Sequence, residues 1–279
     1  MPPHLSVAIT PVVALLLAQP AGGTYELRLE RTSAEKTADD KSTSSSFDRD
    51  TVLERVVAVR DDGIELEYDN PSGSTDDDRA RNWLLPFRVF RPRAGPTLLL
   101  NADELASRAD PWLKRFKMTR AACGQWGFSW TAYKVDCDPQ SALAIAERFD
   151  LWGDVGDGVP YRYPGTLAAS PLHRVAIGPE GSRYTVDLAI DADAYRRERA
   201  DADVAIGTIM RKPVTLADAL RQRAAMTVVG TVKVAFDTDA AGRVRRRTVT
   251  TTLVTREPGE TERTTTTVET LDRLPAQTK

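Results

Sequence analysis

The sequence holds few side chains that could act together in nucleophilic or metal chemistry. Its histidines are His4, close to the start, and His173. A Ser-His-Asp triad or a histidine-based metal site would therefore depend on His173 alone, and a structural or surface role is more common for such a residue. We expect no hydrolase chemistry centred on His173, and we interpret the protein as a non-enzyme.

Three carboxylates could gather around a cation. Asp150, Asp154 and Asp157 lie in a glycine-rich stretch, and Ca²⁺ prefers several oxygen ligands on a flexible backbone. Their spacing fits no EF-hand loop, so an ordinary polar turn is the favoured interpretation and a weak calcium site is the alternative. We expect no metal ion and no other cofactor.

Three arginines alternate along a predicted strand near the end of the chain. Arg243, Arg245 and Arg247 would lie on one face of that strand, where like charges repel one another. Such an arrangement favours an anionic partner, such as a lipid head group, because guanidinium groups bind phosphate and carboxylate well. The alternative, and the favoured one, is a solvated strand balanced by the acidic residues between positions 257 and 262.

Five aromatic residues form a second candidate for ligand contact. Trp126, Trp130, Trp152, Tyr161 and Tyr163 lie close together in the sequence. Large aromatic side chains can contact lipid or sugar, although packing in the core is their more common role. We therefore keep both interpretations, a ligand-binding platform and a part of the core.

All five of these aromatics belong to a segment that also holds both cysteines. The stretch from Arg120 to Tyr163 contains Cys123 and Cys137, and we expect it to be the centre of the fold, a staple and a hydrophobic plug. In an oxidising compartment two cysteines without a third competitor should form a disulfide. Closing a ring of about 15 residues should stabilise the fold by about 3 kcal/mol in the chain-entropy model.

The first residues suggest such a compartment. Residues 7–18 are apolar apart from Thr10, and small and turn-forming residues follow. This length matches a signal peptide and is too short to span a bilayer, although Lys and Arg are missing before it and a buried helix is the alternative. We predict cleavage after Ala18, with Ala21 as the alternative, and a periplasmic or secreted protein.

Composition excludes a nucleic-acid partner. The 279 residues include 38 basic and 40 acidic side chains, which leave a formal charge of −2. Such a balance gives no positive field that would attract a polyanion. With 41% hydrophobic residues the chain can bury a full core, and antiparallel β folds of this length often form one domain.

Alternation of apolar and polar residues predicts strands in the first part of the chain. Tyr25, Leu27 and Leu29 alternate with charged residues, and Thr51 to Tyr68 has the pattern of a hairpin. Between them, Thr32 to Ser46 is polar without a period, so we expect a solvated hairpin tip or a mobile loop.

Helical spacing begins at Asn101. The helices predicted from there are one to Phe116 that is interrupted at Pro111, a short one from Pro139 to Phe149, and two that begin at Asp193 and Thr215. Strands are predicted from His173 and from Tyr184. The chain should end in a meander of three strands: Thr227 to Phe236, Val244 to Arg256 and Thr261 to Leu271.

These strand patterns carry a resemblance to a known group. The strand from Tyr25 to Leu29, the hairpin from Arg55 to Tyr68 and the strand from Gly230 to Asp237 resemble secreted bacterial proteins of the lipoprotein-carrier-like β-clam type. The resemblance implies a half-barrel whose concave side is closed by helices and binds an acyl chain or another apolar ligand. The Thr-rich stretch from Thr248 to Thr252 departs from that pattern, because a lipid-carrying face should be more apolar.

We therefore predict an α+β fold: a curved antiparallel β-sheet, a half-barrel or β-clam, with several short helices packed on one side. Residues 1–18 would be the signal peptide, and residues 19–279 a single two-lobed domain. Its parts would be an N-terminal β lobe (24–100), a central helical and disulfide segment (101–165) and a C-terminal β/α lobe (172–274).

The favoured function is a non-enzymatic binding or carrier protein for an apolar or lipid-like ligand. Its partners would be a lipid or another apolar ligand, and possible further contacts are a membrane surface or an envelope protein. The alternatives are a cell-envelope structural or protein-interaction module without a small ligand and, third, a hydrolase of unknown type.

Overall fold

The computed structural model describes residues 22–39, 41–128 and 132–276. The predicted signal peptide and both candidate cleavage positions, Ala18 and Ala21, lie outside these residues, so export stays a prediction. No helix within the described ranges is long and apolar enough to cross a membrane.

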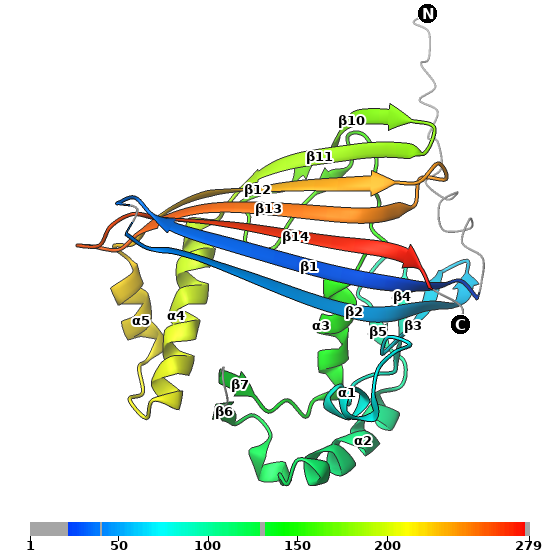
Figure 1. Ribbon diagram of the computed structural model, residues 1–279, viewed down its shortest axis with the longest axis horizontal. Helices are drawn as coiled ribbons and strands as arrows, with labels where there is room; N and C mark the ends of the chain where they lie inside the picture. Colours follow the sequence, from blue (N-terminus) through cyan, green and yellow to red (C-terminus); the bar gives the residue numbers. More distant parts are fainter. Residues whose placement is uncertain (1–21, 40, 129–131, 277–279) are drawn as a thin grey trace, which may run out of the picture.

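The main element of the described chain is a ten-stranded antiparallel sheet with the order β10-β11-β12-β13-β14-β1-β2-β3-β4-β5 (Figure 1). The first half of the sequence supplies β1 (Thr24–Thr37), β2 (Thr43–Arg60), β3 (Gly63–Asp69), β4 (Phe87–Pro92) and β5 (Leu98–Leu99). The second half supplies β10 (His173–Gly178), β11 (Gly181–Ala189), β12 (Thr227–Thr238), β13 (Val244–Arg256) and β14 (Arg263–Pro275). The last strand, β14, pairs with both β13 and β1, so strands of both predicted lobes share one sheet.

The helices lie on one side of this sheet in Figure 1. They are α1 (Asp76–Arg81), α2 (Ala102–Arg115), α3 (Ala142–Arg148), α4 (Ala192–Ile209) and α5 (Leu216–Arg223), with short 3-10 turns η3 (Arg120–Ala122) and η4 (Pro139–Ser141). Two small hairpins complete the described chain: β6 (Trp126–Phe128) with β7 (Ala132–Lys134), and β8 (Pro160–Tyr161) with β9 (Ser170–Pro171). The predicted α+β class, a curved antiparallel sheet with helices on one side, is confirmed.

Alternation along the strands gives the sheet two different faces. On the face that the helices cover, the inner face, Leu27 and Leu29 are almost fully buried. On the opposite, outer face, Arg28 pairs with Glu26 at 2.7 Å and Arg49 pairs with Glu30 at 2.6 Å. Because successive side chains of a strand point to opposite faces, the period of two in the sequence predicts this division. The inner face carries a large core cluster that extends from Phe87 on β4 to Val234 on β12, and a small second cluster of Met226, Val228 and Leu253.

Helix α2 forms where it was predicted, but Pro111 does not divide it into two helices. It is one helix that contains Pro111, and its buried side consists of Leu105, Ala109 and Leu113. Asn101 precedes it, but its side chain does not cap the helix. Instead the Asn101 amide oxygen accepts a hydrogen bond from the Arg88 backbone at 2.9 Å and so ties the helix to β4.

The polar stretch from Thr32 to Ser46 is more regular than expected. β1 continues to Thr37 and β2 begins at Thr43, so most of this stretch is strand and only its middle is a turn. The strand persists because β1 has a partner on both sides there: Ser33 is opposite Ser46 of β2 and Thr267 of β14. Backbone hydrogen bonds therefore maintain a strand that its own side chains do not predict.

The disulfide segment is not the hydrophobic centre of the fold. The predicted bond between Cys123 and Cys137 is confirmed, with a Cα–Cα distance of 5.6 Å. However, the β6–β7 hairpin inside the ring forms a separate small sheet, and Trp126 on it is 40% exposed. The prediction of a plug holds only for the later part of the stretch: Ala142, Ala146, Phe149 and Leu151 belong to the core cluster on the inner face, whereas the β6–β7 hairpin lies apart from it.

Removing the disulfide should loosen this hairpin and leave the sheet intact. In the variant Cys123→Ser/Cys137→Ser, the amides of Gly124 and Val135, which bond across the hairpin at 2.7 and 2.9 Å, should exchange hydrogen faster. The amides of β12 should exchange as in the wild type, and the global free energy of unfolding should fall by clearly less than about 3 kcal/mol. Faster exchange throughout β12 would mean that the hairpin and the sheet unfold as one unit.

Candidate functional site

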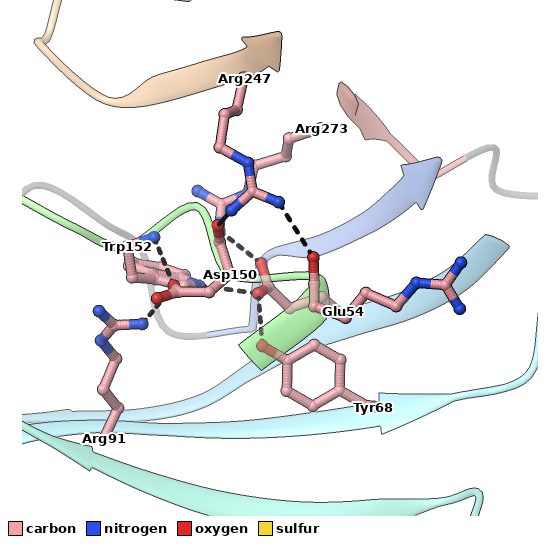
Figure 2. A network of polar contacts seen from close by, with 8 residues as sticks. Glu54, Tyr68, Arg91, Asp150, Trp152, Arg247 and Arg273 are labelled. Carbon is pink, nitrogen blue, oxygen red and sulfur yellow. Dashed lines mark hydrogen bonds and ion pairs between the residues drawn. The ribbon is translucent and has the colours of Figure 1, made fainter. Parts of the chain in front are cut away.

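A buried charged cluster lies on the inner face where β2, β3 and β14 meet the loop after α3 (Figure 2). Its centre is the carboxylate of Glu54, which is fully buried. One oxygen accepts a hydrogen bond from Arg273 at 2.7 Å. The other accepts bonds from the indole of Trp152 at 2.7 Å and from the hydroxyl of Tyr68 at 3.3 Å.

Strand register brings these residues together. Glu54 lies opposite Tyr68 on β3 and opposite Tyr25 on β1, so all three share the inner face. Arg273 of β14 reaches the same place, and its guanidinium lies 5.2 Å from the ring of Tyr25 and 4.3 Å from that of Trp152. A weakly hydrated guanidinium suits such a position, because aromatic faces attract it while Glu54 neutralises it.

The electrostatics of the cluster follow from its burial. Burial raises the pKa of Glu54 above the usual range, while the charge of Arg273 and the hydrogen bonds from Trp152 and Tyr68 oppose the rise. Burial and the neighbouring Glu54 raise the pKa of Tyr68, so this phenol is a neutral donor. Donors therefore surround both oxygens of the Glu54 carboxylate, and they link β2, β3 and β14 to the loop after α3. We call this cluster of Glu54, Tyr68, Trp152 and Arg273 the clamp.

The clamp continues along the loop that follows α3. Asp150 forms an ion pair with Arg91 of β4. The guanidinium of Arg247 donates to the backbone oxygens of Asp150 and Arg148 at 3.2 Å each, and it lies 3.5 Å from Glu269. Three strands, β4, β13 and β14, therefore hold the start of this loop against the sheet.

A cleft of about 560 Å³ lies between the inner face and α4, at the other end of the same loop. Its floor comes from β12, β13 and β14 and consists of Val232, Val249, Thr251, Leu253, Thr265 and Thr267. Its walls include Tyr163 of the loop, Ile190 after β11, and Tyr195 and Glu198 of α4; Arg31 of β1 and Glu269 also line it. Burial and the charge of Glu269 raise the pKa of Tyr163, so its hydroxyl is a neutral donor at the cleft.

A larger groove lies at the ends of β11, β12, β13 and β14 and has a volume of about 920 Å³. Most of its charged residues are already paired: Arg183 pairs with Asp237 at 2.6 Å, Arg246 with Asp272 at 2.5 Å, and Arg243 with Asp239 at 2.6 Å. Ion pairs of this kind leave little field for a ligand, so the smaller and more enclosed cleft is the better candidate site.

The predicted aromatics do not form one platform. Tyr163 lines the cleft, Trp152 belongs to the clamp, and the Tyr161 ring packs edge-on against Phe236 with centroids 5.2 Å apart. Trp126 lies on the separate β6–β7 hairpin. Trp130 lies outside the described residues, and a role in ligand contact stays a prediction for these five.

The predicted shared face of the three arginines is wrong. Arg243 lies in the turn before β13 and pairs with Asp239. A β-bulge shifts the register between β12 and β13, so Arg245 is exposed and has no cross-strand partner. Beyond the bulge, Arg247 lies opposite the buried Phe236 on the inner face.

The calcium interpretation also fails. Asp150 is paired with Arg91, and Asp157 accepts a hydrogen bond from the backbone of Arg174 at 2.9 Å. Within the described ranges no group of three or more His, Cys, Asp or Glu residues could hold a metal ion. His173 is exposed at the start of the edge strand β10.

Sequence reasoning missed the two residues that matter most here, Glu54 and Arg31. Both continue an inner-face pattern: Glu54 stands between Val52 and Val56, and Arg31 follows Leu27 and Leu29 at the same period. A charged residue at an apolar position of a predicted strand was the available signal, because a buried charge needs a partner or a function.

Comparisons with known proteins assign no family. No protein-family model and no curated protein sequence matches the chain. Among solved structures the chain is similar to lipovitellin, in a structure that describes lipid-protein interactions in that protein, with 8% sequence identity and a TM-score of 0.39. The match covers 94% of this chain and 26% of the lipovitellin chain, so this chain spans about a quarter of that protein's length.

Replacing Arg273 with Met should lower the free energy of unfolding at neutral pH by about 3–5 kcal/mol, because Glu54 stays buried without its counter-charge. The pKa of Glu54, already raised in the fold from its usual 4.5, should rise further. A carboxyl with a raised folded-state pKa stabilises the fold below its unfolded-state pKa and loses this contribution as the pH rises through the folded-state pKa. Urea unfolding should therefore show the smallest deficit below about pH 4.5 and a growing deficit above it.

The double variant Arg273→Met/Glu54→Gln is the control. It has no titrating carboxyl at this position, so its stability should not show the additional loss of the single variant as the pH rises. Parallel stability curves for the single and double variants across this range would contradict an ionised Glu54 in the clamp.

Proposed function

We propose that the protein is a non-enzymatic binding or carrier protein that holds an apolar or lipid-like ligand in the cleft between α4 and the inner face. The observation that carries the proposal is the cleft itself. Its volume of about 560 Å³ lies within the range of about 300–1,000 Å³ that is typical of small-molecule sites. Val232, Val249 and Leu253 give it an apolar floor, and Tyr163 and Ile190 extend the apolar surface along its walls.

The polar groups of the cleft support binding better than turnover. Of its two carboxylates, Glu269 faces the guanidinium of Arg247 at 3.5 Å, which holds it as a paired charge. Threonine hydroxyls on the floor can orient a ligand, but a hydroxyl needs an adjacent base to act as a nucleophile. A few placed polar groups in a mostly apolar cleft are typical of ligand recognition.

We also infer that the protein is exported and that residues 19–279 act as a single two-lobed domain. The disulfide supports export, because such bonds persist in oxidising compartments, and the apolar segment 7–18 fits a signal peptide. The shared sheet supports the single domain. The partner would then be an apolar or lipid-like molecule of the periplasm or the extracellular space.

A protein-interaction module without a small ligand is the second candidate, and β10 favours it. All residues of this edge strand are exposed, including Val175 at 57% and Ile177 at 72%. An exposed edge strand can pair with a strand of another chain. A protein of this kind would not need the cleft, so ligand binding separates the two functions.

Filling the cleft should abolish binding of an apolar probe. Nile red, an uncharged dye that fluoresces in apolar sites, should bind the wild type, and Thr251→Trp should weaken its binding by at least about tenfold, or about 1.4 kcal/mol. The reason is that Thr251 lines the floor and an indole there would occupy the volume that the probe needs.

The matched control is Thr252→Trp, the same change one residue later on the outer face of β13. It should bind Nile red as the wild type does and should fold with similar stability. Equal binding by both variants, or no Nile red binding by the wild type, would exclude a carrier function for this cleft and favour the interaction module.

A further inference from the structure

The polarity of the cleft floor changes from one strand to the next. β12 and β13 contribute Val232, Val249 and Leu253 and one threonine, Thr251, whereas β14 contributes two threonines and Glu269. The next strand, β1, contributes Arg31. The floor is therefore apolar at one side and polar at the other, and this change runs across the strands.

Strand register makes the change abrupt. Val234, Val249, Glu269 and Arg31 lie side by side on four consecutive strands of the sheet. Neighbouring strands are about 4.8 Å apart, so about 10 Å separates the apolar Val249 from the cationic Arg31. A ligand lying across these strands would meet both surfaces at once.

Arg31 forms no ion pair within 4.0 Å among the described residues, although its charge acts on the nearby Tyr163. Its cross-strand neighbours are Glu269 and Asp48. Glu269 faces Arg247 at 3.5 Å, and Asp48 faces Arg148 at 4.0 Å. None of the ion pairs among the described residues includes Arg31, and its side chain is exposed at the cleft.

Hydroxyl groups beside Arg31 fit the same ligand group. Thr267 lines the cleft, and its hydroxyl lies 3.3 Å from that of Ser33, two residues after Arg31 on the inner face. A guanidinium with hydroxyl donors nearby is a typical site for carboxylate or phosphate oxygens. Of the two carboxylates at the cleft, Glu269 lies beside Arg31 but faces Arg247 at 3.5 Å, and Glu198 lies on α4 and not on the floor.

We propose that the ligand of this cleft is an amphipathic molecule with an anionic head, held by Arg31 and Thr267, and an aliphatic tail over Val232, Val249 and Leu253. This inference rests on the proposed carrier function and specifies its ligand class. The head is a carboxylate or a phosphate, since both present the oxygens that a guanidinium binds.

The test compares four ligands with the same tail and different heads. Myristate, tetradecyl phosphate, tetradecanol and tetradecyltrimethylammonium would each displace Nile red from the wild type below their micelle-forming concentrations. The two anions should bind at least about tenfold tighter than tetradecanol, a difference of about 1.4 kcal/mol. Arg31→Gln should remove this preference and leave the affinity for tetradecanol unchanged.

The matched control is Arg28→Gln, which removes the same charge from the outer face of the same strand, where Arg28 pairs with Glu26. It should keep the preference for anions. A stronger effect on one anion assigns the head as carboxylate or phosphate and supports the proposal.

Other outcomes overturn the proposal in distinguishable ways. Equal binding of all four ligands by the wild type, or equal losses in Arg31→Gln and Arg28→Gln, would exclude the role of Arg31 and leave the carrier function standing. If tetradecyltrimethylammonium bound most tightly, the head group would be recognised by Glu198 and not by Arg31. Failure of Nile red itself to bind would remove the carrier function and this inference together.

Discussion

The structure depends on the burial of one carboxylate, that of Glu54. Moving an ionised carboxylate out of water costs several kcal/mol unless donors surround it. Here the donors come from β3, β14 and the loop after α3, so the charge is compensated only when all of them are in place. The compensation is incomplete on the cationic side, because Nε of Arg273 is buried and has no hydrogen-bond partner among the described residues. A buried pair of this kind contributes more to the uniqueness of the arrangement than to its stability, and it fixes where the loop that ends at Tyr163 leaves the sheet.

This constraint explains how a Thr-rich sheet can still border an apolar cleft. The threonines of β13 and β14 would argue against a lipid-binding face only if the inner face had the same polarity everywhere. The inner face instead changes with position: Arg273, Leu271 and Glu269 follow one another along β14. The same strand thus carries the buried clamp, the core and then the polar side of the cleft. Polar residues there take little of the apolar floor, because all of them except Thr251 lie on β14 and β1, whereas the apolar residues lie on β12 and β13.

Local sequence patterns predicted the helices and strands. The features that these patterns did not predict depend on pairing between segments that are far apart in the sequence. A period of two was enough for the strands around Leu27 and Val232, and capping residues such as Thr215 were enough for α5. The face of Arg245 was not predictable, since a bulge opposite β12 breaks the alternation without a signal in the residues of β13. The cleft was not predictable either, because its residues come from four strands, one helix and the segments around Tyr163 and Ile190, which are far apart in the sequence. The only sequence signal for the site was the presence of charged residues, Glu54 and Arg31, at positions where the strand pattern predicts apolar residues.

The same topology makes the site a late product of folding. β14 comes last among the strands in sequence but lies in the middle of the sheet, between β13 and β1. The hydroxyls of Ser33 and Thr267, which border the polar side of the cleft, are 234 residues apart in the chain. Contacts with such separations form slowly, because the entropy of closing a long loop is lost before the contact stabilises the chain. Neither the clamp nor the cleft floor can be complete until β14 has inserted beside β1. Both Glu54, through Arg273, and Arg31, through Glu269, therefore depend on β14 for their native surroundings, one as a buried pair and the other as a cation open to the cleft.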